Sequence, residues 1–152
     1  MKAAILSDTH GLLRAQVLDQ LEEAEHLIHA GDVGDPEILD VLREIAPLTV
    51  VRGNVDRGEW AQSLPQSEAV ELEGFWIYVL HDLGRLDLDP AAAGFSVVIS
   101  GHSHRPDVIT RGGVLYLNPG SAGPRRFHLP ISMAWLYLDG GQVRAELIDL
   151  EK

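Results

Sequence analysis

Two histidines, His102 and His104, flank a single serine in the segment VISGHSHRPD, which spans residues 98–107 and begins with an apolar run. Imidazole contributes little to packing at a strand end, but its neutral form is a common ligand of transition-metal ions. A surface loop would explain the pair if it stood alone. Metal binding therefore requires further ligands from other parts of the chain.

Side chains of the ligand type also follow most of the other short apolar runs. Ligands gather at the carboxyl ends of strands in open α/β sheets, so we expect these groups to converge at one edge. Taken singly, each has an ordinary structural role, such as capping a helix, occupying a turn or bonding to the backbone. Glycine stands beside several of them and permits tight turns and a close approach to a ligand. The groups are Asp8, His10, Asp32, Asn54 and His81.

Together with the histidine pair, these residues are too many for one ion. Two clusters of His and Asp that share a carboxylate would form a two-metal site, in which the ions lie about 3.5–4 Å apart. The mixture of imidazole, carboxylate and amide favours Mn²⁺, Fe²⁺ or Zn²⁺ over Ca²⁺, which prefers oxygen ligands. Two such ions lower the pKa of a bridging water toward neutrality and make hydroxide available as a nucleophile.

Short apolar runs that end at Gly, Asp or Pro are typical of buried strands, and they must position these groups. A strand–helix alternation at the start of the chain predicts parallel strands, whereas the hairpin signal at 139–141 predicts antiparallel ones near its end. The fold is therefore α/β, with one mixed sheet or two sheets face to face. The predicted strands are residues 2–7, 26–30, 48–52, 75–80, 95–100, 113–118, 131–138 and 142–150.

Two helices are predicted between the early strands, at 12–23 and 36–45, because apolar residues recur there at helical spacing. Asp35 is the expected N-cap of the second helix, and Pro36 suits its first position. The apolar stripe of the first helix is Leu13, Val17, Leu18 and Leu21, and that of the second is Ile38, Val41, Leu42 and Ile45.

The composition, with 45% hydrophobic and 23% charged residues, predicts one globular domain over residues 1–152. A net charge of −11 argues against nonspecific nucleic-acid binding, since such a surface repels a phosphate backbone. No apolar run is long enough for a membrane span. The chain has no cysteine, which excludes thiol chemistry and leads us to expect a cytoplasmic location.

Five motifs in order, SDTHG, HAGDV, RGNVD, SGHSHRP and LNPGS, make the chain resemble the calcineurin-like metallophosphoesterases. The resemblance is strongest to the small single-domain bacterial and archaeal phosphodiesterase branch, whose relatives include the retromer scaffold subunit. It runs from the first strand through Ser121. It implies two mixed β-sheets packed face to face and flanked by helices.

The resemblance also implies a ligand set for each of two divalent ions, with Asp32 bridging them. It assigns catalytic roles to Asp32, Asn54 and His81, and it implies Mn²⁺ as the metal, with Zn²⁺, Fe²⁺ or Ni²⁺ as alternatives. The first ion would be held by Asp8, His10, Asp32 and His104, and the second by Asp32, Asn54, His81 and His102.

Two positions depart from the family pattern. Val55 stands where many relatives have a histidine that protonates the leaving group, which indicates a preference for good leaving groups or protonation by water. His81 is followed by Asp82 and then Leu83-Gly84, where relatives often have His-Gly-His. Asp82 is either a residue that orients His81 or a surface turn residue.

The remaining polar residues receive supporting roles. Arg125 and Arg126 are candidates for binding a substrate phosphate through paired hydrogen bonds. Asn118 is expected to shape a turn that supports the histidine loop. Three histidines are expected outside the ligand set: His26 at a helix end, His29 hydrogen-bonded in the interior and His128 in a loop.

The predicted function is hydrolysis of a small phosphoester, mainly a diester, by a hydroxide that bridges two metal ions. The alternative is a protein-interaction scaffold on the same fold with weak or no catalysis. A scaffold is free to lose ligands, and this chain keeps the full set. A homo-oligomer is possible because an edge strand or a helix face could pair.

Overall fold

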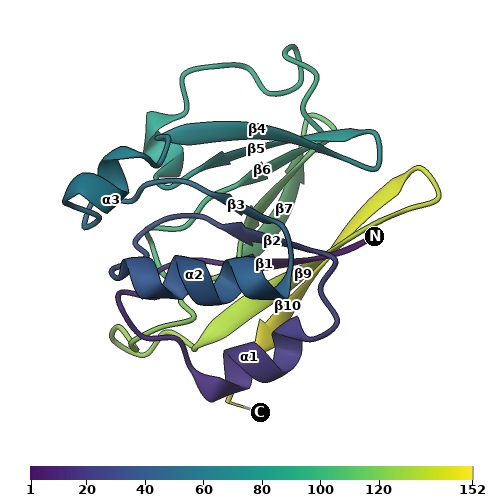
Figure 1. Cartoon of the computed structure of the whole chain (residues 1–152). Coiled ribbons are helices and arrows are strands. Elements are labelled where there is room, and N and C mark those ends of the chain that lie inside the picture. The colour runs from purple at the N-terminus through teal and green to yellow at the C-terminus, as the bar shows by residue number, and fades with distance from the viewer. Residues whose placement is uncertain (152) are drawn as a thin grey trace.

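A computed structural model describes residues 1–151, and within them the strands form two mixed five-stranded sheets that face each other (Figure 1). The predicted fold class is therefore confirmed. The first sheet contains β1 (Lys2–Leu6), β2 (His26–His29), β3 (Leu48–Val50), β9 (Ser132–Asp139) and β10 (Gln142–Asp149). The second contains β4 (Ser67–Leu72), β5 (Phe75–Leu80), β6 (Val97–Ile99), β7 (Asp107–Arg111) and β8 (Val114–Asn118).

Each sheet contains three adjacent parallel strands, which lie at the centre of the second sheet and extend to the edge strand β3 in the first. The first sheet has the order β10-β9-β1-β2-β3 and the second β4-β5-β6-β8-β7. Strands β1, β2 and β3 run parallel, as do β5, β6 and β8, whereas the other neighbours are antiparallel. Parallel strands end at the same edge, so the loops that follow them lie close together.

The two longest helices, α1 (Ala15–Leu21) and α2 (Pro36–Ile45), both cover the outer face of the first sheet (Figure 1). Strand β1 is consequently buried on both sides. Ile5 packs between the two sheets, whereas Leu6 packs against the helices. Complete burial of a leucine side chain stabilises the fold by roughly 1.5–3 kcal/mol.

Helix α2 begins as predicted, because the Asp35 carboxylate accepts a hydrogen bond from the Glu37 N–H at 2.9 Å. Its buried face differs from the predicted stripe. Val41 and Ile45 are 40% and 36% exposed, whereas Leu39 is buried with Ile38 and Leu42. The apolar residues form a stripe broader than the contact with the sheet, so the sheet covers only one side of it.

Four elements lie outside the predicted ones: strands β4 and β7, the short helix α3 (Glu59–Gln62) and the 3₁₀ turn η1 (Leu83–Arg85). Both strands lie at the edges of the second sheet. Every residue of β7 is exposed, and β4 is mostly exposed. An exposed edge strand has no apolar run, so the criterion used for the other strands cannot detect it.

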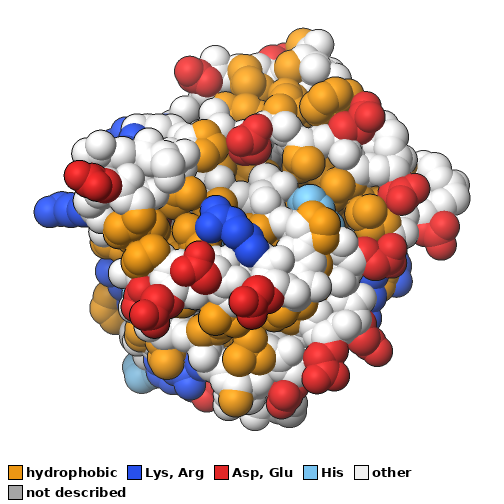
Figure 2. All heavy atoms as spheres, in the orientation of Figure 1, with side chains coloured by type: hydrophobic (Ala, Val, Ile, Leu, Met, Phe, Trp, Pro, Cys, Tyr) orange, Lys and Arg blue, Asp and Glu red, His pale blue; other side chains and the backbone are white. Residues whose placement is uncertain are grey.

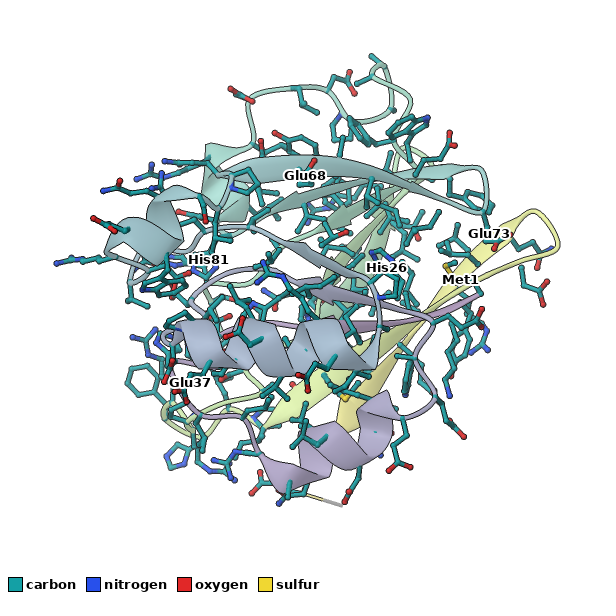
Figure 3. The ribbon with its side chains drawn as sticks, viewed as in Figure 1. Met1, His26, Glu37, Glu68, Glu73 and His81 are labelled. Atoms are coloured by element: carbon teal, nitrogen blue, oxygen red, sulfur yellow. The ribbon has the colours of Figure 1, made fainter. Side chains whose placement is uncertain are left out.

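The prediction for His26 was wrong, because this residue begins β2 instead of ending a helix. Figure 3 shows His26 at the end of the sheets opposite to His81. None of the helices in residues 1–151 has the length and apolar character needed to cross a bilayer. Acidic side chains are spread over the face of the molecule in Figure 2, in agreement with the net charge of −11.

Candidate metal centre

The loops after the parallel strands bring all seven predicted ligand residues to one edge of the two sheets. The loop after β1 carries Asp8 and His10, and the loops after β2 and β3 carry Asp32 and Asn54. From the second sheet, His81 follows β5, and the histidine pair 102 and 104 follows β6. Residues separated by as many as 96 positions in the sequence therefore lie close together at this edge.

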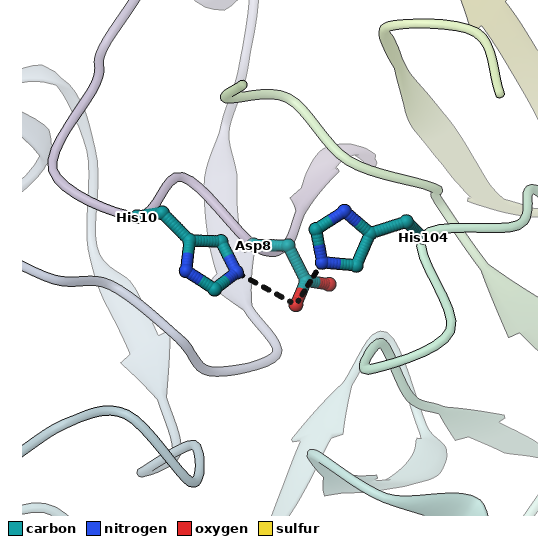
Figure 4. A group of neighbouring side chains, drawn as sticks. All are labelled: Asp8, His10 and His104. Atoms are coloured by element: carbon teal, nitrogen blue, oxygen red, sulfur yellow. Dashed lines mark ion pairs between the residues drawn. The ribbon is translucent and has the colours of Figure 1, made fainter. Parts of the chain in front are cut away.

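Asp8, His10 and His104 form the first group of potential ligands (Figure 4). The Oδ1 atom of Asp8 lies 3.3 Å from His104 Nε2 and 3.6 Å from His10 Nε2. All three side chains offer ligand atoms within 4.8 Å of one another. Asp8 and His104 are buried, and His10 is partly exposed at the mouth of the site.

Asp32, His81 and His102 form the second group, which Asn54 completes. The Oδ2 atom of Asp32 lies 3.1 Å from His81 Nε2. One end of the Asn54 amide lies 3.1 Å from His81 Nε2 and 3.3 Å from His102 Nδ1. Asp32 Oδ2 also lies 3.5 Å from His10 Nε2, so this oxygen stands between the two groups.

The side chains meet through carboxylate oxygens, imidazole nitrogens and one amide group, which are ligand types that transition-metal ions use in proteins. The His81 Nδ1–H donates to the Ala30 carbonyl at 2.8 Å, so a neutral ring presents the Nε2 lone pair to Asp32. Among residues 1–151, Asp8 Oδ1, His10 Nε2 and His104 Nδ1 are buried polar atoms without a hydrogen-bond partner. A divalent cation would remove the cost of leaving Asp8 Oδ1 and His10 Nε2 buried without a donor. His104 faces Asp8 through its other nitrogen, Nε2.

The spacing of these atoms also fits a shared ion. Two ligand atoms that are each about 2.1 Å from one ion in tetrahedral geometry lie about 3.4 Å apart. The separations of 3.1–3.6 Å between carboxylate oxygens and imidazole nitrogens agree with that value. The residues present therefore fit divalent metal ions.

Each aspartate uses one oxygen to fix its orientation and leaves the other for the site. Asp8 Oδ2 accepts hydrogen bonds from the Ser7 hydroxyl at 2.7 Å and from the His102 N–H at 3.1 Å. Asp32 Oδ1 accepts from the Val55 N–H at 3.0 Å. The second oxygen of each, Asp8 Oδ1 and Asp32 Oδ2, is the one that faces the histidines.

The backbone carries strain at most of these positions. Side chains other than glycine seldom adopt positive φ, although Asp and His tolerate it better than most. Such strain persists only where the surrounding structure holds it, and it clusters at functional sites. The ligand residues with positive φ are Asp8 (57°), His10 (45°), Asp32 (58°), His102 (72°) and His104 (61°).

Two glycines allow the loops to approach this closely. A Cβ atom added at Gly53 would collide with Asp32, and one added at Gly101 would collide with the Ser7 hydroxyl. The glycines beside the ligands therefore serve the close approach that the sequence led us to expect.

Asp56 ties together the loops that carry Asp32 and Asn54. Its buried carboxylate accepts hydrogen bonds from the N–H groups of Val33, Gly34 and Gly53 at 2.9–3.2 Å. Sequence reasoning missed this role, and it missed that of Ser7 as well. Both are short polar residues close to a ligand in the chain, but nothing in the sequence tells which distant amide groups they meet.

Two other supporting residues agree with their predicted roles. The Asn118 amide donates to the Gly101 carbonyl at 3.0 Å and so supports the histidine loop. His29 is fully buried, its Nε2 lies 3.0 Å from the Thr9 hydroxyl, and its Nδ1 accepts from the Gly31 N–H at 3.1 Å. Because Thr9 donates to the Val33 carbonyl, its oxygen accepts from His29, and the ring is held neutral with the proton on Nε2.

The electrostatics keep both carboxylates ionised. Burial opposes the charge of Asp8, but the His10 and His104 rings and the Ser7 hydroxyl outweigh it and hold the pKa of Asp8 well below its usual range. For Asp32, burial likewise opposes ionisation, and the contact with His81 lowers the pKa overall. In turn, Asp8 raises the pKa of His10.

The residues proposed to contact substrate lie in an exposed loop. Arg125 donates to the Leu129 carbonyl at 3.1 Å and pairs with Glu151. Arg126 is close enough to His10 to lower its pKa, in opposition to Asp8. His128 is exposed in the same loop. Of the two arginines, Arg126 is the one whose charge acts on His10.

The two departures from the family pattern have clear positions. Asp82 Oδ1 accepts from the Gly84 N–H at 3.0 Å, so Asp82 caps the turn η1, and Ala30 orients His81 instead. The Val55 side chain is 41% exposed, and its N–H holds Asp32.

Comparison with known proteins agrees with this geometry. The family described as the calcineurin-like phosphoesterase superfamily domain matches residues 1–141. A protein of Methanothermobacter thermautotrophicus named a probable metallophosphoesterase is 34% identical over 160 residues, which cover 97% of this chain and 92% of that protein.

Two solved structures are similar over almost the whole chain. A structure described as a novel archaeal phosphodiesterase has a TM-score of 0.78 at 23% identity, covers 97% of this chain and is itself fully covered. Vps29 of Entamoeba histolytica in complex with Zn²⁺ has a TM-score of 0.75 at 25% identity, with 99% of each chain covered. The first of these similarities, below 25% identity, concerns the fold alone.

Proposed function

Because this chain belongs to the calcineurin-like phosphoesterase superfamily, we propose that it hydrolyses small phosphodiesters at a centre of two divalent cations. The observation that carries the proposal is the position of Asp32 Oδ2, 3.5 Å from His10 in one ligand group and 3.1 Å from His81 in the other. One carboxylate oxygen is thus within reach of both ions. When bound, the two cations supply Lewis acidity, which provides hydroxide near neutral pH and offsets the charge of the phosphoryl oxygens.

The chain's own residues hold and orient this chemistry. Asp8 and Asp32 remain charged at any physiological pH, since their pKa values lie below the usual range. We assign Asn54 and His81 to the same reaction centre, because the Asn54 amide and His81 Nε2 lie 3.1 Å apart beside Asp32. We propose the ligand set that the sequence predicts: Asp8, His10, Asp32 and His104 for one ion, and Asp32, Asn54, His81 and His102 for the other.

Two hollows beside the centre support a diester as the substrate. One has a volume of about 750 Å³ and the other about 240 Å³, and His102 lines both. A phosphorus atom bound beside His102 would therefore have room for an ester arm on each side. A monoester would use only one hollow, and we expect it to be the weaker substrate.

Protonation of the leaving group has no residue assigned to it. Val55 is apolar at the position where many relatives carry a histidine, and it is 41% exposed to water. We therefore propose that the enzyme favours leaving groups that depart as stable anions, or that water protonates them. Arg126 is the proposed contact for a phosphoryl oxygen, and Arg125 would have to release Glu151 to join it.

The ligand types favour Mn²⁺, with Zn²⁺, Fe²⁺ or Ni²⁺ as alternatives, since imidazole and carboxylate together suit all four. The experiment strips the protein with a chelator, adds back Mn²⁺, Zn²⁺, Ni²⁺ or Mg²⁺, and compares bis-p-nitrophenyl phosphate with p-nitrophenyl phosphate. Metal-dependent hydrolysis of the diester, lost in Asp32→Ala, supports the proposal. Metal binding without turnover of either ester would favour a scaffold, an alternative that the similarity to Vps29 keeps in view. The cytoplasmic location stays a prediction from the absence of cysteine.

A further inference from the structure

The larger hollow beside the metal centre is much bigger than a phosphoryl group requires. Its volume of about 750 Å³ lies within the range of about 300–1,000 Å³ that is typical of small-molecule pockets. Asn54, His81 and His102 form the wall that it shares with the metal centre. A substrate arm bound there would extend directly from the reacting phosphorus.

An arginine in the wall of this hollow has its charge available for a ligand. Arg52 is half-buried, precedes Gly53-Asn54 and makes no ion pair with any residue between 1 and 151. Its backbone is fixed, since its N–H donates to the Pro65 carbonyl at 2.8 Å. A half-buried guanidinium group without an anionic partner is a strong binder of phosphate or carboxylate.

The other charged residues of the hollow do not neutralise Arg52. Both oxygens of the Asp56 carboxylate are occupied by backbone N–H groups. Arg85 Nε lies 4.0 Å from Asp82 Oδ2, so these two charges largely offset each other, and Asp87 is exposed. None of the acidic residues that line the hollow forms an ion pair with Arg52, so its guanidinium group remains available to a bound anion.

Another part of the wall is apolar. Tyr78 and Leu80 of β5 line the hollow, and the Tyr78 ring packs against Phe95 at a centroid distance of 5.1 Å. A substrate arm that combines a ring with an anionic group would therefore match these lining residues, the ring at Tyr78 and the anion at Arg52.

We propose that this hollow binds the organic arm of a phosphodiester that carries a second phosphate, as a nucleotide arm does, and that Arg52 binds this second phosphate. The inference rests on the proposed function and adds the substrate class to it. It makes Arg52 a residue that determines specificity without taking part in the reaction.

Two chromogenic diesters that differ only in the second phosphate test this inference. They are thymidine 5′-(p-nitrophenyl phosphate) and the same compound with a 3′-phosphate. In both, water attacks the 5′-phosphorus and the bond to the p-nitrophenyl oxygen breaks. The products are the 5′-phosphate dianion and p-nitrophenolate, and two protons are released. An arginine–phosphate pair should raise kcat/KM for the 3′-phosphorylated compound by about 10- to 100-fold.

The variant Arg52→Met should remove this preference and lower kcat/KM mainly for the 3′-phosphorylated compound. Arg43→Met is the matched control, because Arg43 lies on α2 away from the hollow, and it should keep the preference. If Arg52→Met unfolds, Arg52→Lys should fold and keep only part of the preference. Equal kcat/KM values for the two compounds in the unmodified protein would overturn the inference and leave the proposed function intact.

A binding measurement separates the two proposals further. Calorimetry with the Mn²⁺-loaded protein should show that thymidine 3′,5′-bisphosphate binds about 10-fold or more tightly than thymidine 5′-phosphate, and that Arg52→Met removes the difference. If neither ester is hydrolysed but this difference is found, the hydrolytic function is wrong and the anion site stands. Equal binding of the two ligands would overturn the anion site.

Discussion

His10 Nε2 lies 3.5 Å from Asp32 Oδ2, although the two residues follow different strands of the first sheet. The same oxygen lies 3.1 Å from His81 Nε2, which comes from the second sheet. Asp32 is therefore the residue through which the two ligand groups, and the two sheets, meet at one edge.

The variant Asp32→Asn should lose more activity than a variant that lacks only a hydrogen-bond partner of a metal ligand. Loss of such a partner typically lowers activity roughly 10- to 100-fold. The amide removes the negative charge that the two ions share, and it places an N–H₂ group near one of them. We expect kcat for bis-p-nitrophenyl phosphate to fall at least about 100-fold. Asp40→Asn on the exposed face of α2 serves as the control, and equal activity of both variants would contradict a bridging role.

Gly101→Ala should destabilise the fold and weaken metal binding together, because the added methyl group would collide with Ser7 and approach Asp8 Oδ2 to 2.7 Å. Overpacking of this kind costs typically about 1–3 kcal/mol. In Gly84→Ala, the matched control, the methyl group would meet only the end of the Asp82 side chain at 3.3 Å. Urea unfolding and metal titration measure both effects, and a variant as stable as the control would refute the close approach.

Asp56→Asn should lower the free energy of unfolding by roughly 3 kcal/mol, the upper range for hydrogen bonds to a charged group. Both oxygens of Asp56 accept hydrogen bonds from the backbone N–H groups of Val33, Gly34 and Gly53. In the variant, one of these oxygens becomes an N–H₂ group, which can only donate. Asp19→Asn on the exposed side of α1 should change stability by less than about 0.5 kcal/mol. Denaturant unfolding at pH 7 distinguishes the two, and similar stabilities would mean that Asp56 does not hold the loops.

His29 should make the fold less stable in mild acid. Burial lowers the pKa of His29 to about 4 from 6.5. Between these values the unfolded chain takes up a proton that the folded chain excludes, so stability is lost as the pH falls from 6.5 toward 4. The expected loss is about 3 kcal/mol, at about 1.36 kcal/mol per pKa unit.

The measurement is the free energy of unfolding of the metal-free protein and of His29→Gln, each at pH 7 and at pH 4. Glutamine does not titrate, so the advantage of the unmodified protein over the variant should shrink by about 3 kcal/mol across this range. A difference between the two proteins that does not change with pH would show that His29 titrates normally.

The sequence permits a good prediction of the elements that carry chemistry and a poorer one of those that do not. Strands such as β1 and β6 are buried apolar runs that are followed closely by candidate ligand residues, so both their position and their role can be predicted. Strand β7 has no buried residue, and its pairing with β8 depends on a backbone edge that composition does not reveal.

The same limit applies within the site. The ligand residues are recognisable because Asp, Asn and His recur after apolar runs, but their supports depend on contacts between distant loops. Ser121, for example, donates to the Asp8 carbonyl at 3.1 Å across 113 positions. Arg52 lies two positions before the predicted ligand Asn54, yet only the folded structure shows that Arg52 lines the hollow.

The number of divalent cations bound per chain tests the central claim most directly. Elemental analysis of the protein after loading with Mn²⁺ and removal of free metal should give two ions per chain, with one per chain or fewer in Asp32→Ala. One ion or none in the unmodified protein would contradict a centre in which two groups of ligands act on one phosphorus atom.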